Sequence, residues 1–355
     1  MCLRPFVRDS EGRMMAPIQV CVIGCGRAGM IHARDYAGGV RGARLYAIAD
    51  PSEQARENAQ AELGVEHVYA DWHEAIENPK IDAVVVVTPT AMHRDIVVTA
   101  AEAGKHVFCE KPMAASEAEC EEMIAACDKN GTKLQLGFMR RFNESLQHAR
   151  RAIDEGQIGD VVLVKSLTRG PSHPKPWMYN VRESYGPIGE VNSHDLDTLR
   201  WFAGSEVRSI FAQGGNFRSP EVADEFPEWY DTVTMSLTFD DGKLGLVDGA
   251  QYVQYGYDAR VEVLGTEGSI LVGQQPRETF VVTGSDGQVR RPMNNSWTYL
   301  FREAYQREDQ AFIDAIVRDE EPAATGHDGL MAVRLVNMGL QSLLENRVVM
   351  DDSRA

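Results

Sequence analysis

The chain has 355 residues and a mass of 39.4 kDa, which is the length of two ordinary domains, each large enough to bury its own core. The 53 acidic and 36 basic side chains give a formal net charge of −17, which argues against nucleic acid or an anionic membrane surface as a partner. With 43% hydrophobic and 25% charged residues, the composition is that of a globular protein and excludes a wholly disordered one.

The N-terminal residues 1–16 carry five charged side chains and no apolar core, unlike a secretory signal peptide. We expect a disordered N-terminal extension or a misassigned start, with Met14 or Met15 as the initiator. The six cysteines lack CxxC spacing, which favours reduced thiols and a cytoplasmic location. No run approaches the roughly 20 apolar residues that cross a bilayer, so no membrane partner is expected.

Residues 17–140 alternate short apolar runs with helical stretches. The expected strands are continuous apolar segments, as is usual where helices cover both faces of a parallel sheet. This pattern predicts an α/β domain. The expected strands are Ile18–Ile23, Ala43–Ala49, His67–Tyr69, Ala83–Val87, His106–Cys109 and Lys133–Gly137, and the helices are Ala28–Ala37, Pro51–Leu63, Trp72–Ile76, Met92–Ala103 and Glu117–Lys129.

Residues 141–355 follow a different pattern, because most of their strands come without intervening helices. A polar loop, 168–189, holds four of the 15 prolines. The pattern predicts an α+β domain with a large, mostly antiparallel, open-faced sheet. The expected strands are Val161–Leu167, Ser209–Gly214, Thr232–Phe239, Lys243–Ala250, Asp258–Leu264, Gly268–Val272 and Thr279–Thr283, and the helices are Glu144–Asp154, Glu190–Ala203, Tyr305–Arg318 and Asp328–Leu344.

A glycine-rich turn follows the first strand directly and opens a helix. Glycines at GxGxxG spacing permit a tight turn, close backbone approach to a pyrophosphate and close packing of helix on strand. The second strand ends at Asp50, where a carboxylate accepts hydrogen bonds from a ribose diol and repels a 2′-phosphate. The sequence therefore predicts a Rossmann domain that binds NAD in preference to NADP. The turn residues expected to bind the cofactor are Gly24, Gly26, Arg27, Ala28 and Gly29.

Two further strand ends carry polar residues. Because ligands of such sheets lie outside the carboxyl ends of the strands, both ends should border the nicotinamide half of the cofactor. The residues expected there are Thr88, Pro89, His93, Glu110 and Lys111.

In the second domain, Glu190, His194 and Asp197 recur at helical spacing and should share one face. A histidine held by a carboxylate can accept a hydroxyl proton near neutral pH. An acid-rich first helical turn favoured by the macrodipole is the alternative. His194 could also hold a metal ion together with Glu190, Asp195 and Asp197. One histidine without HxxxH or CxxC spacing makes this the minority interpretation, and no metal site is predicted.

The order of these motifs resembles the Gfo/Idh/MocA oxidoreductases, the family of glucose/fructose oxidoreductase and inositol dehydrogenase. The resemblance extends from Ile18 to the closing helices, and the stretches 137–142 and 255–258 are most similar to myo-inositol 2-dehydrogenases. It implies that Lys111 contacts the nicotinamide ribose and the substrate, and that His194 is the catalytic acid/base. Glu190, the third expected catalytic residue, stands where inositol dehydrogenases usually carry aspartate, and the loop 169–176 also departs from the inositol pattern. Further expected substrate contacts are Arg140, Arg169, Asn192, Tyr255 and Tyr257.

Several functions remain open at this stage. The first is an NAD-dependent dehydrogenase that oxidises a secondary hydroxyl of a cyclitol or sugar to the ketone. A close alternative oxidises a ring hydroxyl of a pyranose or glycoside, for example at C3, and the long loop 168–189 could admit this larger substrate. A non-catalytic NAD-binding sensor and a metal-dependent hydrolase or lyase are alternatives of other classes. The open sheet and the resemblance also imply a homo-oligomer, a dimer or a tetramer built through that sheet.

Overall fold

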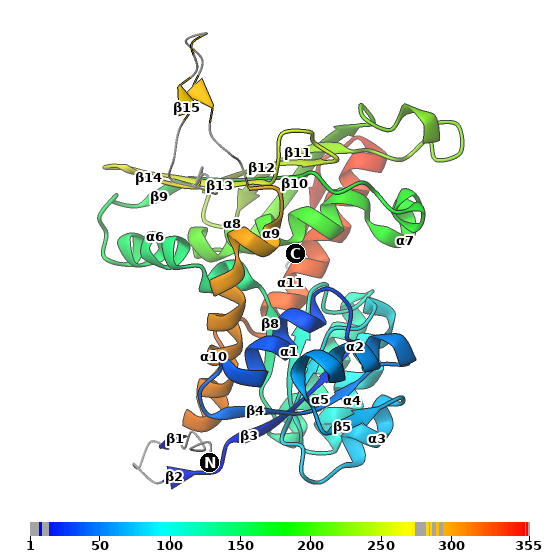
Figure 1. The fold of residues 1–355 in the computed structure, drawn as a ribbon. Coiled ribbons are helices and arrows are strands. Elements are labelled where there is room, and N and C mark those ends of the chain that lie inside the picture. The colour runs from blue at the N-terminus through cyan, green and yellow to red at the C-terminus, as the bar shows by residue number, and fades with distance from the viewer. Residues whose placement is uncertain are drawn as a thin grey trace. The chain divides into compact units, whose positions relative to one another are not determined.

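The computed structural model describes residues 7–8, 14–273, 282–283, 285, 289–290, 294–351 and 353, in two compact units (Figure 1). The first unit comprises the described residues up to Phe142 together with Glu303–Met331. The second comprises Asn143–Arg302 and the described residues from Ala332 onward. The expected boundary after residue 140 thus lies two residues from the observed one. An uninterrupted C-terminal domain over 141–355 differs from this division, because the chain returns to the first unit.

The first unit is built on a six-stranded sheet in which every neighbouring pair is parallel. The strand order is β5-β4-β3-β6-β7-β8, so the first strand of this unit's sheet lies at its centre, and strands are added on one side of it up to β5 and on the other side from β6 onward. This is the dinucleotide-binding order of a Rossmann fold, as predicted. The strands are β3 (Ile18–Ile23), β4 (Ala43–Ala49), β5 (His67–Tyr69), β6 (Ala83–Val86), β7 (His106–Glu110) and β8 (Leu134–Gly137).

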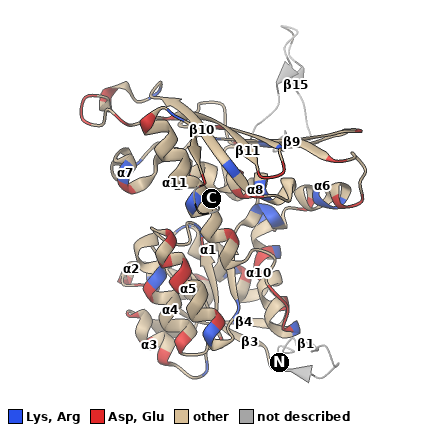
Figure 2. Cartoon of the chain, turned by 180° about the vertical axis from the view of Figure 1, so that it is seen from behind, with Lys and Arg blue, Asp and Glu red and all other residues tan. Residues whose placement is uncertain are grey.

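Helices connect these strands, and polar side chains fix several of the helix ends. At the start of α5, Ser116 accepts the amide of Glu119 while the Glu119 carboxylate accepts the amide of Ser116, a reciprocal capping box. Acidic and basic residues both occur along these helices (Figure 2). The helices are α1 (Gly29–Gly38), α2 (Glu53–Leu63), α3 (Trp72–Glu77), η1 (Thr90–Met92), α4 (His93–Glu102), α5 (Glu117–Asn130) and η2 (Met139–Phe142).

Helix α10 (Arg302–Arg318) brings the chain back to the first unit. Its Phe312 and Ile313 are fully buried in the core formed by α1 and strands β3, β4 and β6. Burying each such side chain contributes about 1.5–3 kcal/mol, which is why this segment belongs with the Rossmann sheet. Helix α11 (Gly326–Glu345) begins in the first unit and ends in the second.

The second unit contains a seven-stranded sheet of order β14-β13-β9-β12-β11-β10-β17. Its pairs are antiparallel except β9 with β12, which confirms the prediction of a mostly antiparallel sheet. The strands are β9 (Val161–Gly170), β10 (Val207–Gly215), β11 (Thr232–Phe239), β12 (Leu244–Gln251), β13 (Asp258–Gly265), β14 (Ser269–Val272) and β17 (Val349–Met350), of which β17 was not predicted.

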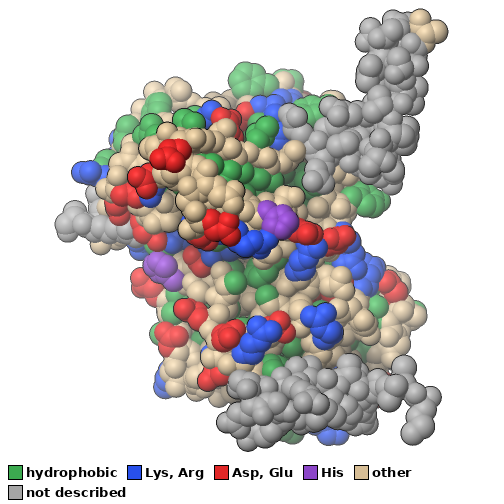
Figure 3. Space-filling model, turned by 90° about the vertical axis from the view of Figure 1, so that its left-hand side faces the viewer, with side chains coloured by type: hydrophobic (Ala, Val, Ile, Leu, Met, Phe, Trp, Pro, Cys, Tyr) green, Lys and Arg blue, Asp and Glu red, His purple; other side chains and the backbone are tan. Residues whose placement is uncertain are grey.

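Among the described residues, helices cover one face of this sheet and not the other, which is called the open face. Leu196, Leu199 and Phe202 of α8 and Leu335 of α11 are fully buried in one core with the inward side chains of the strands. The open face carries exposed apolar side chains, and Figure 3 shows hydrophobic side chains among charged ones over this unit. The helices are α6 (Glu144–Asp154), η3 (Pro176–Tyr179), α7 (Val181–Ser184), η4 (Ile188–Asn192), α8 (Ser193–Ala203), η5 (Pro220–Val222) and α9 (Trp297–Leu300).

Three predicted segments differ from the structure. The helix expected from Glu190 begins at Ser193, because η4 before it is a π-helical turn. Of the strand expected at Thr279–Thr283, only β15 (Val282–Thr283) is described, and it pairs with β16 (Val289–Arg290) in a ladder separate from the large sheet. In the N-terminal extension, expected to be disordered, the described β1 (Val7–Arg8) and β2 (Met14–Met15) pair antiparallel.

Candidate functional site

The turn between β3 and α1 has the geometry that a pyrophosphate requires. Gly24 has φ +98°, a conformation that side chains rarely adopt. A Cβ on Gly29 would lie 1.8 Å from the carbonyl oxygen of Gly24, so only glycine allows the helix to start so close to the strand. A Cβ on Gly26 would meet nothing within 4 Å, which leaves its backbone open to a ligand. Arg27 is exposed and Ala28 is half-buried beside it. The residues present therefore fit NAD.

Asp50 lies directly after β4, as predicted, and its carboxylate reaches the glycine turn. Its Oδ2 accepts the amide of Cys25 at 2.7 Å and its Oδ1 accepts the amide of Ser52 at 2.8 Å. A carboxylate has about four lone-pair sites, so these two bonds leave room for a ribose hydroxyl. Asp50 is thus held at the turn before any cofactor arrives.

His93 ties two strand ends together. Its Nε2 lies 2.9 Å from the carbonyl oxygen of Thr88 and its Nδ1 lies 2.9 Å from that of Pro112. Burial lowers the pKa of this imidazole, although the carbonyl groups favour its charged form. Both ring nitrogens face protein carbonyls, so the histidine braces the loops after β6 and β7, beside half-buried Thr88 and exposed Pro89.

Glu110 and Lys111 follow β7 at the predicted edge of the sheet. The Glu110 carboxylate is buried, and its Oε2 accepts the backbone amide of Lys111 at 2.9 Å. Lys111 is half-buried and joined to Pro112 by a cis peptide bond. Arg140, in η2 after β8, is 2% exposed. The structure thus gathers these predicted residues at the carboxyl ends of neighbouring parallel strands.

In the second unit, a π-helical turn precedes the helix that carries His194. Glu190 lies in this π-helical turn, whereas His194 and Asp197 lie in the α-helix that follows it, so the three residues are not on one continuous α-helix. Their shared face stays a prediction. Glu190 is half-buried, His194 is 7% exposed and Asp197 is 1% exposed. Single π-turns occur frequently at functional sites.

Asp195, which follows His194, anchors the start of α8. Its Oδ1 accepts hydrogen bonds from Ser166 Oγ and, at 2.9 Å, from Thr168 Oγ1 of β9. Its Oδ2 accepts the side-chain amide of Asn192 at 2.8 Å. Sequence reasoning considered Asp195 only as a metal ligand, since nothing local to it reveals partners 27 and 29 residues away. These three hydrogen bonds fix the backbone next to His194.

Asn192 and Tyr257 lie on the helix-covered side of the sheet. Asn192 is fully buried, and a Cβ on Gly249 would lie 2.1 Å from its Oδ1, so that glycine makes room for the amide. Tyr257 is 9% exposed. Its ring packs against Gly170, and a Cβ on that glycine would lie 3.8 Å from the ring. Both remain predicted substrate contacts.

Arg169 and Tyr255 belong to a different region. Ser166 and Thr168 of β9 point to α8, so Arg169, one residue further, points to the open face. Its Nε donates to Asp248 Oδ1 at 3.1 Å, and hydrogen bonding to Asp248, supported by Tyr255, raises the pKa of the guanidinium. Tyr255 also donates to Asp258 at 3.2 Å. Arg169 therefore lies on the face of the sheet opposite α8, and Tyr255 lies in the loop between β12 and β13. Both stay predicted substrate contacts.

Metal ligands do not gather in the described part of the chain: no three His, Cys, Asp or Glu side chains there could hold one ion. Asp195, a candidate ligand, is already bonded to two hydroxyl groups and an amide. Among the described helices, none combines the length and apolar character needed to cross a membrane.

The strand order, the glycine turn and Asp50 define the first unit as a dinucleotide-binding domain, joined to a unit with a buried histidine at a helix start. Residues 18–138 match the model of an oxidoreductase family with an NAD-binding Rossmann fold, and residues 146–271 match the GFO/IDH/MocA C-terminal domain. The chain belongs to the Gfo/Idh/MocA family and is an NAD-dependent oxidoreductase acting on CH–OH groups.

Three relatives illustrate the likeness. The chain is 36% identical to a myo-inositol 2-dehydrogenase of Thermotoga maritima over 94% of this chain and 98% of the relative. It is 35% identical to a scyllo-inositol 2-dehydrogenase (NAD(+)) of Bacillus subtilis over 88% and 90%. A crystal structure of scyllo-inositol dehydrogenase from Lactobacillus casei with bound NAD(H) and scyllo-inositol is 29% identical, covers 94% and 99% of the two chains, and has a TM-score of 0.86.

Proposed function

We propose that this oxidoreductase is an inositol 2-dehydrogenase that converts one secondary ring hydroxyl of a cyclitol to the ketone. The observation that carries the proposal is the braced helix start, where Asp195 fixes the residue next to His194, in a chain similar to enzymes named for myo- and scyllo-inositol. NAD supplies the hydride acceptor. The chain's own residues must then remove the hydroxyl proton and stabilise the oxygen that loses it.

We assign the proton transfer to His194, as the base. Lys111 is the cation that stabilises the developing charge on the same oxygen, and Glu190 orients the substrate or His194. A general base typically contributes 10² to 10⁴ in rate. His194→Ala and Lys111→Ala should therefore each lower turnover at least about a hundredfold while NAD still binds.

The matched controls are His148→Ala and Lys129→Ala, because both residues are exposed and outside the proposed site. NAD binding is measured by titration of the intrinsic fluorescence, and turnover by NADH absorbance. Near-normal turnover of His194→Ala or Lys111→Ala would contradict the catalytic role assigned to that residue. NAD binding by the wild type without turnover on any polyol or sugar would instead favour the NAD-binding sensor.

The substrate is tested with a panel of myo-inositol, scyllo-inositol, glucose and simple glycosides. We expect the highest kcat/KM for an inositol. Glu190 carries one methylene more than the aspartate expected in inositol dehydrogenases, and this favours a sugar or glycoside as the second candidate substrate. Glu190→Asp should raise the preference for inositol if the residue sets substrate choice, and a preference for glycosides in the wild type would overturn the inositol assignment.

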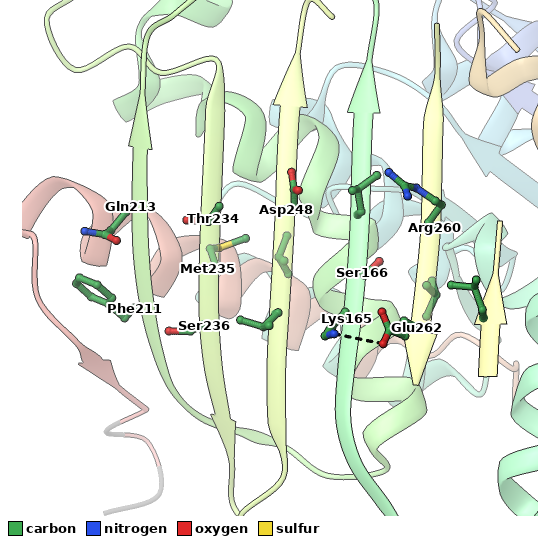
Figure 4. A pocket seen from close by; sticks show the side chains of 15 residues that line it. Lys165, Ser166, Phe211, Gln213, Thr234, Met235, Ser236, Asp248, Arg260 and Glu262 are labelled. Atoms are coloured by element: carbon green, nitrogen blue, oxygen red, sulfur yellow. Dashed lines mark hydrogen bonds and ion pairs between the residues drawn. The ribbon is translucent and has the colours of Figure 1, made fainter. Parts of the chain in front are cut away.

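We also propose that two or more copies associate through the open face of the seven-stranded sheet. Side chains from six neighbouring strands line a groove of about 560 Å³ there (Figure 4). Leu246 is 41% and Leu271 is 70% exposed in this groove, while Lys165 and Glu262 pair at 3.2 Å within it. Exposed apolar patches on a folded chain mark interaction surfaces.

Light scattering tests this association. We expect a mass of two or four chains, and a smaller mass for Leu246→Glu. Phe217→Glu is the control, because Phe217 is 73% exposed and outside the groove. A monomeric wild type would overturn the proposal.

We further assign the protein to the cytoplasm. Five cysteines are free and buried. Burial raises the pKa of Cys25 to about 12 and that of Cys127 to about 11, so these thiols are protonated and unreactive. Detection of the protein in a secreted fraction would contradict this assignment.

A further inference from the structure

The first unit buries a series of ionisable groups that the cofactor and substrate roles do not use. His32 of α1 is 0% exposed, and its Nδ1 lies 2.8 Å from Oδ1 of Asp309 on α10, which is also 0% exposed. On its other side, Nε2 of His32 lies 3.4 Å from Oε1 of Glu110 at the end of β7. One imidazole thus lies between two buried carboxylates, one from β7 and one from α10.

The series continues to Lys111. Glu110 has two carboxylate oxygens: Oε1 faces His32, and Oε2 accepts the backbone amide of Lys111 at 2.9 Å. A Cβ on Gly137 would lie 2.8 Å from the Glu110 carboxyl carbon, so this glycine provides the space that the carboxylate occupies. Asp309, His32, Glu110 and Lys111 therefore form one continuous path from α10 to the carboxyl end of β7.

Hydrogen bonds hold α10, which carries Asp309, in place against the rest of the first unit. Gln306 donates to the carbonyl of Gly39 at 2.9 Å, and Gln310 donates to that of Arg41 at 3.1 Å, both at the end of α1. Gln135 of β8 donates to the carbonyl of Glu308 at 3.0 Å. These bonds set the position of Asp309 relative to the strands of the same unit.

The groups facing His32 are mainly acidic. They come from α1, α10 and β7, and the rings of Phe108 and Tyr305 pack at 4.9 and 5.5 Å from the imidazole. Burial lowers the pKa of His32, but Asp309 and Glu110 outweigh it and raise that pKa well above 6.5. Burying a charge costs several kcal/mol per ion unless it is paired, and here the imidazole lies between two carboxylates. The titratable groups nearby are Asp35, Tyr36, Tyr305, Glu308, Asp309 and Glu110.

We propose that the buried series Asp309–His32–Glu110 positions Lys111 for the reaction. His32 and Asp309 are positioning residues, since they act through Glu110 and touch neither substrate nor cofactor. The inference rests on the proposed role of Lys111. A shift of the Lys111 backbone would displace its ammonium from the reacting oxygen, and a misplacement of about 1 Å can cost about a hundredfold in rate.

The test uses Asp309→Asn and His32→Gln, each alone and combined with Lys111→Ala. We expect each single variant to lower kcat about ten- to a hundredfold while the Kd for NAD changes less than twofold. In the Lys111→Ala background, we expect no further loss, because there is no ammonium left to position. Asp314→Asn on α10 is the matched control and should leave kcat unchanged.

A second measurement does not depend on activity. In histidine-labelled protein without cofactor, ¹⁵N NMR at pH 7.5 should show both ring nitrogens of His32 protonated in the wild type, with His32→Gln giving the assignment. Asp309→Asn should convert the ring to the neutral form. If Asp309→Asn should fail to fold, His32→Gln carries the kinetic test alone.

The outcomes separate this inference from the proposed function. If Asp309→Asn or His32→Gln lowers kcat by the same factor in the Lys111→Ala background as alone, its role is merely structural and the inference is overturned. Near-normal kcat in the single variants would overturn it as well. Normal turnover of Lys111→Ala alone would overturn the proposed role of Lys111, and with it the positioning. A neutral His32 in the wild type would refute the charged series directly.

Discussion

Removing the Asp195 carboxylate should destabilise the second unit severely, because it accepts three hydrogen bonds where it is 0% exposed. Asp195→Ala leaves donors on Ser166, Thr168 and Asn192 without their acceptor. Each orphaned buried donor costs about 1–3 kcal/mol. Hydroxyl groups can rotate to another acceptor, so we count the amide and one hydroxyl, which gives about 2–6 kcal/mol. A domain has about 5–15 kcal/mol in total, so the loss is a large part of it.

Asp195→Asn separates the loss of charge from the loss of contacts. Its amide oxygen can accept from Asn192, and its amide nitrogen can donate to the hydroxyl oxygens, so we expect a cost of only about 1–2 kcal/mol. Because His194 adjoins this residue, kcat should fall while the affinity for NAD, bound by the first unit, stays unchanged.

Urea unfolding followed by tryptophan fluorescence measures both variants, since Trp201 and Trp229 lie in the second unit. Asp224→Asn, an exposed change in the same unit, is the control. The reasoning is refuted if Asp195→Ala lies within about 0.5 kcal/mol of the wild type, the range of ordinary surface substitutions.

Three other predictions follow from single contacts. Gly26→Ala should keep the fold but weaken NAD binding, whereas Gly29→Ala should also lower the Tm, because its Cβ would meet the Gly24 carbonyl; equal Tm values in a thermal scan would contradict this. The raised pKa of His32 means that protonation of its imidazole contributes its full stability below about pH 6.5 and that this contribution is lost as pH rises through the higher folded pKa. Unfolding free energy should therefore fall above pH 6.5 by up to about 1.4 kcal/mol per pH unit, with a smaller slope in His32→Gln. If Arg169 contacts the substrate as predicted, Arg169→Leu should raise the KM of the polyol roughly tenfold or more, because a hydrogen bond to a charged group is lost, and a change of less than about twofold would contradict that contact.

The sequence predicted well the bounds of helices and strands that turn or capping residues delimit. The bounds of Ile18–Ile23, Thr232–Phe239 and Glu144–Asp154 agree to the residue, because each segment is flanked by turn or capping residues. The start of α8 was misplaced, because its π-turn accompanies bonds between Asp195 and a strand far away in the sequence. No periodicity within residues 188–203 contains that information.

The candidate site divides in the same way. The glycine turn and Asp50 could be predicted because their spacing encodes the conformation that a dinucleotide needs. The face on which Arg169 lies could not be predicted, because alternation shows which strand residues share a face but not which face meets a helix. The role of Asp309 was equally hidden: the apolar side of α10 shows that it packs on a core, and only the fold shows which one.

The acidic excess of this chain also has two parts that the sequence cannot separate. Most carboxylates are exposed, but Asp195, Asp231, Glu110 and Asp309 are buried, and a buried carboxylate persists only where donors or cations compensate its lost hydration. Asp231 accepts the amides of Phe217 and Arg218 and pairs with the Arg218 guanidinium. Asp195 accepts two hydroxyl groups and an amide, and Asp309 faces His32. Each of these acids contacts a segment other than its own, so they act as internal anchors of loops and helix starts.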